Sequence, residues 1–543
     1  MNDSPSTRLT VSTARLRLFA AIAATAALLP AGRAVQFKAG EVDVSFDTTL
    51  SFGGLYRLKN PDPAYYSVTN SFNGVLGLQN SSNVDDGNLN YGKGWVSSLL
   101  KGNHDLELKY RNYGALVRGY WYHDFKADDT VRTPLSEQAE DRSVRGAQFL
   151  DMFVRGEFTV GNNLPLDLRI GRQVLSLGES TFIPNGLNVV NAVDLAKLRV
   201  PGAELKEAFL PVNMIKASLG LTSNITIEPY YLLEFRRNEL EPAGTYFSNN
   251  DFASRGGSQV WLGFGTLPEG GPIGSISREK DRDASNYNQY GVAMRILAPG
   301  LNNTEFGLYF SRFNSRSPVL SARTPLAGVN PDLTGPLTQA FIRGGVPAAQ
   351  AGPQAAAIFQ LIVRSQTAPQ TLTPVELATL QSAPVQAAIA GARQIALLTA
   401  AASGRYFTEY PESLTMYGAS FNTSLGSSGI SWQGEVSLKN DVPLQVDDVE
   451  LLFATLSSLA PQFGAANQIG SYLGQYGREV TGYRNHRVWT AQSTLTKVFG
   501  PTLGSQQFTL LGEVGGVWAN LPGKDVLRYD GAGTFTGGSQ TAL

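Results

Sequence analysis

Apolar and polar residues alternate strictly along residues 149–176. In the first half, one parity carries Leu150, Met152, Val154, Phe158 and Val160, and the other carries Asp151, Arg155, Glu157 and Thr159. In the second half, Leu164, Leu166, Leu168 and Ile170 oppose Asp167, Arg169 and Gln173. A period of two predicts β strands with one apolar and one polar face. The Gly161-Asn162-Asn163 sequence between them tolerates positive φ, so it predicts a tight hairpin turn.

The same hairpin pattern recurs along the whole chain, with almost no helix to cover the apolar faces. The predicted strands are Val42–Leu58, Trp95–Tyr110, Ala115–Phe125, the two halves of 149–176, Ala208–Leu221, Ile225–Asn238, Tyr287–Ala298, Thr304–Asn314, Leu414–Leu425, Ile430–Lys439, Asn485–Val498 and Gln506–Ala519. One such hairpin alone would fit a soluble sandwich. A large sheet with an uncovered apolar face instead favours an all-β fold, a transmembrane antiparallel β-barrel whose apolar side meets lipid.

Short and long connections between the predicted strands alternate without exception. Short turns lie near residues 111, 161, 222, 300, 427 and 502, and the long segments are 59–94, 126–147, 178–207, 239–286, 315–413 and 440–484. Outer-membrane barrels have short periplasmic turns and longer extracellular loops. A soluble sandwich gives no reason for this alternation, so the connection lengths favour the barrel.

The predicted strands number thirteen, whereas bacterial single-chain barrels have an even number. The sequence ends on GAGTFTGGSQTAL, which is typical of a loop. We therefore expect the chain to lack its final strands, the complete barrel to have about 16, and the first and last visible strands not to pair fully.

Composition agrees with a barrel. The chain has 57 Gly, 27 Phe and 21 Tyr, only 16% charged residues, and a mean hydropathy of -0.11. A helical membrane protein would be far more apolar, whereas half of each barrel strand faces water. The net charge of -1 implies no nucleic-acid partner. The absence of Cys excludes disulfides, a Cys-based metal site and an amino-terminal lipid anchor.

Residues 1–34 have the pattern of a secretory signal peptide. Arginines precede the apolar run 18–29, and small residues up to Ala34 follow it. The run is too short for a transmembrane anchor, which needs roughly 20 apolar residues. We therefore expect export through the periplasm to the bacterial outer membrane, with the barrel formed by 35–543.

The longest connection, 315–413, is rich in Ala, Pro and Gln. The segments Ala348–Ser365 and Pro374–Leu398 predict helices, and neither is apolar enough to span a membrane. This insert could fold into the lumen as a plug, cap the mouth of the barrel, or lie loosely on the surface.

Charged residues gather on the face predicted to line the lumen. The candidate constriction residues are Asp151, Arg155, Glu157, Asp167, Arg169, Glu228, Glu234 and Arg236. On adjacent strands they can pair as a ladder. Such a ladder either neutralises itself and packs the interior or forms a polar constriction that selects solutes by charge. Arg172 lies on the opposite parity near a strand end, where its side chain can reach the membrane interface.

Segment 178–207 is unusually apolar for a loop in water. Its candidate contact residues are Phe182, Ile183, Leu187, Val189 and Val190. An inward fold over the pore would bury them. They would then either touch an apolar solute or serve as packed filling, and the sequence does not choose between these.

No catalytic signature is present in the sequence. The three histidines, His104, His123 and His486, have neither metal-ligand spacing nor a neighbouring nucleophile motif. We expect no enzyme activity, no cofactor and no metal. An outer-membrane lipase or protease is the rival hypothesis, and a Ser–His or Asp–His pair at the barrel wall would distinguish it.

Five stretches of sequence resemble a known family. They are RIGRQVLSLGEST (169–181), NGLNVVNAVDLAKLRVPGAELKEA (185–208), EFRRNELEPAGTYFS (234–248), FDTTLSFGGLYRL (46–58) and LPGKDVLRYDGAGTFTGG (521–538). They are similar to domain-of-unknown-function family 1302 (DUF1302), bacterial outer-membrane barrel proteins. Leu177 and Ala192 depart from the family pattern, which has Trp and Pro there. The resemblance implies a porin-like protein, with a periplasmic companion protein and an inner-membrane transporter of the resistance-nodulation-division (RND) type as partners.

These observations lead to a functional hypothesis, in which the resemblance supplies the class of cargo. We expect a passive outer-membrane channel, narrowed by 178–207 and part of 315–413, that passes a hydrophobic or amphiphilic small molecule. Its partners would be outer-membrane lipids and that solute. The alternative is an unselective porin, followed distantly by the surface enzyme.

Overall fold

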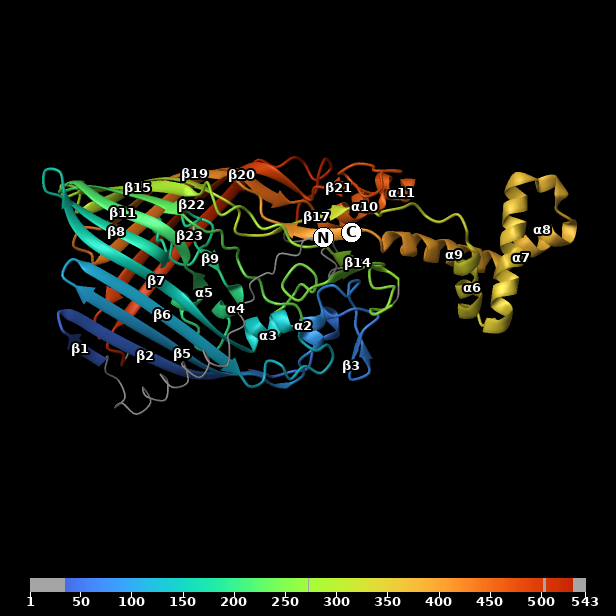
Figure 1. Ribbon diagram of the computed structural model, residues 1–543, viewed down its shortest axis with the longest axis horizontal. Helices are drawn as coiled ribbons and strands as arrows, with labels where there is room; N and C mark the ends of the chain where they lie inside the picture. The colour runs from blue at the N-terminus through green and yellow to red at the C-terminus, as the bar shows by residue number, and fades with distance from the viewer. Residues whose placement is uncertain (1–34, 272, 502–503, 531–543) are drawn as a thin grey trace.

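The protein folds around one antiparallel sheet of fourteen strands (Figure 1). The computed structural model describes residues 35–271, 273–501 and 504–530, so the expected signal peptide lies outside it. The strands are β1 (Val35–Ala39), β2 (Val42–Arg57), β5 (Gly94–Tyr110), β6 (Tyr113–Asp124), β7 (Arg145–Val160), β8 (Leu164–Gln173), β11 (Val212–Thr222), β12 (Ile225–Leu232), β15 (Tyr290–Ala298), β16 (Thr304–Phe313), β19 (Leu414–Ser424), β20 (Ile430–Gln445), β22 (Tyr483–Phe499) and β23 (Phe508–Ala519). All thirteen predicted strands are present, and β1 adds a short hairpin to β2.

Each long strand pairs with its neighbours along the chain, and the sheet curls into a barrel wall (Figure 1). The predicted all-β barrel is thereby confirmed. The sheet begins at β1 and ends at β23, and no pairing joins these two ends among the described residues. The first and last long strands, β2 and β23, are therefore unpaired with each other, as predicted.

Short turns lie at one end of the barrel and long connections at the other (Figure 1). The turn between β7 and β8 contains Gly161 and Asn163, with φ of 53° and 63°. These are left-handed conformations that Gly and Asn adopt most easily, which confirms the turn chemistry.

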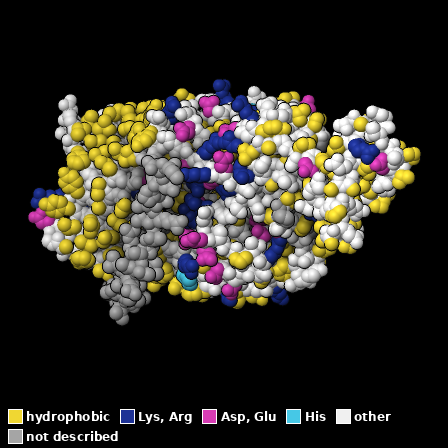
Figure 2. Space-filling view, turned by 45° about the vertical axis from the view of Figure 1, so that its right-hand side comes forward, with side chains coloured by type: hydrophobic (Ala, Val, Ile, Leu, Met, Phe, Trp, Pro, Cys, Tyr) yellow, Lys and Arg dark blue, Asp and Glu magenta, His cyan; other side chains and the backbone are white. Residues whose placement is uncertain are grey.

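The outer face of the barrel is apolar and uncovered. Phe52 is 74% exposed and Val154 58% exposed, and the neighbouring residues of opposite parity point inward. Figure 2 shows hydrophobic side chains gathered over the barrel end and Lys, Arg, Asp and Glu concentrated where the barrel meets the long connections. This distribution matches a wall with lipid outside and a polar lumen inside.

Leu150 is an exception to the predicted alternation. Between the pairs Val117–Met152 and Gly119–Phe149, β7 has one residue more than β6, which is a β-bulge. The bulge reverses the faces beyond it, so Leu150 turns inward and is only 1% exposed, while Phe149 is 43% exposed. The prediction that Leu150 faces outward was therefore wrong, because alternation alone cannot reveal an inserted residue.

An arginine placed on the outer face should destabilise the barrel. Leu168 lies on β8 in the same outward-facing set as Ile170, and Leu168→Arg is expected to cost about 2–4 kcal/mol at mid-membrane depth. Gln433 on β20 faces the lumen and donates to the Glu179 carbonyl at 2.6 Å, so Gln433→Arg keeps a donor there and should be far milder. Denaturant unfolding in lipid vesicles measures both. Equal losses would mean that the faces are misassigned.

Several long connections fold together into a cap at one end of the barrel. Its sheet has the order β13-β14-β18-β17-β21 and is built from three separate loops. The strands are β13 (Gln259–Trp261), β14 (Ser275–Arg278), β18 (Arg405–Glu409), β17 (Val319–Arg323) and β21 (Glu479–Val480), and helices α10 (Asp448–Leu456) and α11 (Pro461–Ala465) lie beside them. Phe252, Ile276, Tyr406 and Leu451 are among the buried residues of its core.

The rest of the cap side consists of short elements. They are η1 (Pro63–Tyr65), β3 (Ser71–Phe72), β4 (Val75–Leu76), α2 (Asp86–Leu89) and α3 (Glu137–Ser143). Arg132 bridges this region to the cap by ion pairs with Asp86 at 3.4 Å and with Glu269.

Insert 315–413 carries four α-helices and the short 3-10 helix η2 (Pro369–Thr371), which project away from the barrel (Figure 1). The α-helices are α6 (Thr334–Arg343), α7 (Ala348–Thr367), α8 (Pro374–Gln381) and α9 (Ala383–Ala401), and they share a small core that includes Leu337 and Ile358. Both predicted helices are confirmed, although the second divides at Ser382. The expectation that part of this insert narrows the lumen was wrong. The strands of the insert join the cap sheet, and its helices pack on one another beyond the cap. Among the described residues, none of the helices has the length and hydropathy to cross a membrane.

Candidate functional site

One connection crosses the lumen from wall to wall. We call residues 174–211, which join β8 to β11, the lumen strap. It contains β9 (Ala192–Val193), α4 (Leu195–Leu198), α5 (Leu205–Ala208) and β10 (Phe209–Leu210). Strands β8 and β11 are adjacent, yet the strap contacts β20, β22 and β23, which lie several strands further around the wall. The strap therefore passes through the interior of the barrel.

Glu435 on β20 holds the strap through its carboxylate. The backbone N–H groups of Glu179, Ser180 and Leu187 donate to it at 2.6, 3.1 and 2.9 Å. The side chain of Gln492 on β22 donates to it at 2.6 Å. Hydrogen bonds to an ionised carboxylate are about twice as strong as neutral ones, so these contacts fix the strap firmly.

Glu513 on β23 holds the next turn of the strap in the same way. The backbone N–H groups of Thr181, Phe182 and Ile183 donate to its carboxylate at 2.9, 2.7 and 3.0 Å. The Thr494 hydroxyl donates to it at 3.0 Å. Two wall carboxylates thus each accept three N–H groups that would otherwise lack partners inside the lumen.

Glycines make this close approach possible. A Cβ at Gly186 would lie 1.8 Å from Glu435 Oε1, and one at Gly178, whose φ is +77°, would lie 2.2 Å from Oε2 of the same carboxylate. A Cβ at Gly418 on β19 would lie 2.0 Å from a methyl carbon of Leu187. Side chains at these three positions would push the strap off the wall.

The opposite end of the strap is anchored to β5. Lys101 and Glu207 form an ion pair at 2.5 Å, with side chains only 1% and 0% exposed. Asn103 donates to the same carboxylate at 2.6 Å, and Lys101 also donates to the Gly202 carbonyl at 2.6 Å. The strap is therefore fastened at both sides of the lumen.

Lys197 on α4 adds a second contact to this wall. Its ammonium lies 3.2 Å from the ring centroid of Tyr122 on β6 and donates to the Arg142 carbonyl at 3.1 Å. Burial lowers the pKa of Lys197 to about 8, and the nearby Asp194 opposes that shift. The ammonium is thus held by an aromatic face and a carbonyl, and the Asp194 carboxylate favours its charged form.

The apolar residues of the strap divide into two groups. Leu187, Val189 and Val190 are buried, in one core with Met214 and Leu414 of the inner wall. These three residues therefore pack the interior between the strap and the wall. By contrast, the Phe182 side chain is 73% exposed. Ile183 is half-buried, and its side chain would touch a Cβ placed at Gly515 on β23, so it packs against the far wall.

Charged side chains form a ladder along the inner wall. On β5 to β7, Arg118 pairs with Asp105 at 2.7 Å and with Asp151 at 2.8 Å, and Arg155 lies 3.5 Å from Glu107. The ladder continues from β8 to β16 through Arg169–Asp167 (3.0 Å), Lys216–Glu228 (3.5 Å), Arg295–Glu228 (3.5 Å) and Arg295–Glu305 (2.7 Å). Opposite charges alternate around half of the wall, so no single sign dominates this side.

Three of the candidate constriction residues lie outside this ladder. Glu157 is exposed near the turn at 161–163. Glu234 and Arg236 follow the end of β12 at Leu232, where the chain has already left the wall. Glu234 accepts from the side chain of Asn213 at 2.6 Å, and Arg236 donates to the Pro211 carbonyl. Placing Glu234 and Arg236 on a longer strand was wrong, because the polar alternation continues beyond the last backbone pair.

Sequence reasoning missed Glu435 and Glu513, the two wall carboxylates that hold the strap. Glu435 stood on the polar parity of its strand, but nothing marked it as special. A usable signal was that Glu435 faces Ser420 and Gln492 across the sheet, with no cation opposite. A wall carboxylate that faces no cation on the neighbouring strands needs other donors, and here the strap supplies them.

The histidines are held in structural settings. His104 faces outward beside Phe46, and the indole of Trp121 donates to its Nε2 at 2.9 Å. His486 lies 2.6 Å from the Tyr529 hydroxyl, and His123 packs edge-on against Phe125. In the described parts of the chain, no three His, Asp or Glu side chains are placed to hold a metal ion.

Three solved structures are similar to this chain over most of its length, each at low sequence identity and low TM-score. Pseudomonas aeruginosa OccK2 (OpdF), crystallised in complex with glucuronate, is 10% identical with a TM-score of 0.25, covering 90% of this chain and 95% of that one. Pseudomonas putida OprB is 8% identical with a TM-score of 0.22, covering 88% and 94%. Acinetobacter baumannii OccAB4 is 8% identical with a TM-score of 0.20, covering 88% and 95%.

Sequence comparison gives a firmer relationship. No curated protein matches the chain. The family described as "Protein of unknown function (DUF1302)" matches residues 15–542, which is nearly the whole sequence and confirms the resemblance found in its motifs. The chain therefore belongs to the DUF1302 family.

Proposed function

We propose that this protein is a passive channel of the bacterial outer membrane whose lumen is made selective by the strap. An antiparallel barrel with an apolar outer face and long loops at one end suits that membrane. The expected export signal at 1–34 agrees with this location.

The observation that carries the proposal is the clamp on residues 179–187. Glu435 and Glu513 bind this part of the strap from the wall opposite its attachment, and its apolar core fills the space between. A simple bore for small ions would not need such filling. The clamped strap therefore favours selective passage over an unselective porin.

The cargo that we propose is a hydrophobic or amphiphilic small molecule. The exposed ring of Phe182 supplies an apolar contact beside the clamp, and the ladder around Arg155 and Arg169 supplies a polar boundary. We also propose that the solute passes to or from a periplasmic companion protein and an RND-type inner-membrane transporter, as the family resemblance implies. The surrounding lipid contacts the outer face.

Reconstitution of the complete protein tests this function. Planar bilayers give the ion conductance, and liposomes give the uptake of fatty or terpenoid solutes beside sugars of similar size. We expect low conductance and a preference for the apolar solutes that weakens in Phe182→Ser. Val375→Ser, on the distant helix α8, is the matched control with an equally exposed side chain. High conductance without any preference would favour the unselective pore.

A further inference from the structure

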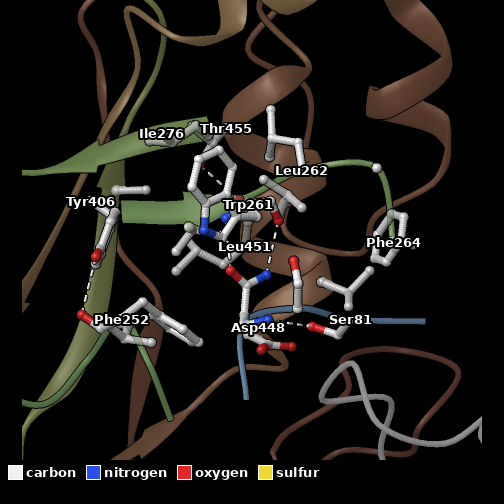
Figure 3. Close-up of a pocket in the computed structure, with 18 of the residues that line it drawn as sticks. Ser81, Phe252, Trp261, Leu262, Phe264, Ile276, Tyr406, Asp448, Leu451 and Thr455 are labelled. Atoms are coloured by element: carbon white, nitrogen blue, oxygen red, sulfur yellow. Dashed lines mark hydrogen bonds between the residues drawn. The ribbon is translucent and has the colours of Figure 1, made fainter. Parts of the chain in front are cut away.

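The cap contains a small apolar cavity, about 90 Å³ in volume, between its sheet and α10. Trp261 and Leu262 line one side of the cavity. Ile276 and Ala322 line the side formed by the sheet, and Leu451 lines the side formed by α10. In Figure 3 the side chains of Trp261, Leu262 and Leu451 point toward one another around this space. Apolar lining with few polar groups is the usual character of a small-molecule site.

An acidic side chain lies at the edge of this cavity, beside Ser81 (Figure 3). It is Asp448, the first residue of α10, and its Oδ1 is buried without a hydrogen-bond partner among the described residues. Buried polar atoms are nearly always satisfied in folded proteins, so an orphaned carboxylate oxygen beside an apolar cavity indicates a missing donor.

Further carboxylates surround Asp448. The Asp530 carboxylate accepts from the Asp448 backbone N–H at 3.3 Å, and Asp447 precedes it as the helix cap. The nearby cations are already engaged. Arg528 is paired with Glu450, and Arg405, which also lines the cavity, donates to the carbonyls of Ala402 and Gly404. In the described part of the chain, no ion pair therefore neutralises Asp447, Asp448 or Asp530.

We propose that this cavity binds a cationic amphiphile, with its apolar chain beside Trp261 and Leu451 and its ammonium on Asp448. This assignment rests on the proposed channel function, in which the cap would be the first part of the protein to bind such a solute. An alcohol would fill the same space but leave the charge uncompensated. A carboxylate would bring no positive charge to this acidic site, and it would be repelled by each of Asp447, Asp448 and Asp530 that is ionised.

Because binding of an ammonium is linked to the ionisation of Asp448, affinity for an amine should depend on pH. Burial, followed by Asp530 and Asp447, raises the pKa of Asp448 to about 8. Binding of an ammonium requires the ionised carboxylate, so it releases a proton from Asp448 at neutral pH. Affinity for an amine should therefore fall roughly tenfold for each pH unit below about 8, while affinity for an alcohol should not change.

The test measures binding by the full chain in lipid nanodiscs. The probes are hexylamine, 1-hexanol and hexanoate, which are short enough to stay largely in water, and the signal is the fluorescence that Trp261→Phe removes. We expect saturable binding of hexylamine, at least tenfold weaker binding of hexanol, and none of hexanoate. Asp448→Asn, which keeps the shape, should weaken amine binding at least tenfold and remove its pH dependence.

Two further variants complete the design. Ala322→Phe fills the cavity and should abolish binding of both amine and alcohol, whereas Val375→Phe on α8 should change neither. Equal binding of the three probes, or unchanged amine binding in Asp448→Asn, would overturn the proposal. Liposome flux is measured separately. Selective flux without cap binding refutes only this site, and cap binding with unselective conductance refutes only the channel's selectivity.

Discussion

Deletion of residues 182–190 from the lumen strap is expected to raise single-channel conductance several-fold. The deleted segment contains two of the three N–H donors to Glu513, one N–H donor to Glu435, and the buried filling of Leu187 and Val190. Without it, water can occupy the space between the two walls, and ions can pass. Recordings from the reconstituted full chain in planar bilayers give the result directly.

Two variants keep this expectation testable if the deletion folds poorly. Glu513→Gln keeps the side-chain volume but loses the charge, so it should increase the frequency of brief openings without changing the fold. Deletion of 366–374, an equally long segment that spans the connection from α7 to α8 and the adjoining helix ends, should leave conductance unchanged. An unchanged conductance after removal of 182–190 would mean that the strap does not limit the lumen.

Replacement of Lys101 by methionine is expected to cost about 3–5 kcal/mol of barrel stability, since it leaves a buried charge unpaired. Glu207 is 0% exposed and would retain only Asn103 as a side-chain donor. Its carboxylate would then have to take up a proton or drag the strap away from β5. Denaturant unfolding of the protein in lipid vesicles measures the loss.

The double variant Lys101→Met with Glu207→Leu provides the internal control. Removal of both charges leaves no unpaired ion, so its loss should be much smaller than that of the single variant. Arg145→Met, which breaks an exposed pair with Glu140, should cost less than about 1 kcal/mol. A single and a double variant of equal stability would show that the Lys101–Glu207 pair contributes packing alone.

The barrel wall could be predicted because its physics is local. Alternation along each strand, Gly and Asn at the tight turns, and the lengths of the connections each depend on neighbouring residues. The exceptions have equally local causes that leave no pattern. The bulge that turns Leu150 inward inserts one residue, and β12 ends at Leu232 although polar alternation continues to Arg236.

The lumen could be predicted only in part, because it depends on contacts between distant segments. The apolar character of 178–207 indicated an inward fold, but nothing in the sequence pairs Leu187 with Glu435, 248 residues away. The cap sheet is harder still, since β17, β14 and β21 come from three loops and each is too short to show a period. The ladder partners Arg118 and Arg295 lay on strands that were predicted, but their pairing needs the register.

The contact between the strap and the far wall is tested most directly by a disulfide. The chain has no cysteine, so a pair introduced at Ile183 and Gly515 can bond only with each other. A Cβ at Gly515 would lie 3.3 Å from Ile183 Cγ2 and 3.1 Å from its Cδ1, close to the reach of a disulfide. Mild oxidation of the full chain in its membrane should cross-link Ile183→Cys with Gly515→Cys nearly completely. It should not cross-link Ile183→Cys with Gly512→Cys, whose Cβ would have no neighbour within 4 Å. Free thiols in the first pair, or equal cross-linking in both, would contradict a strap that crosses the lumen.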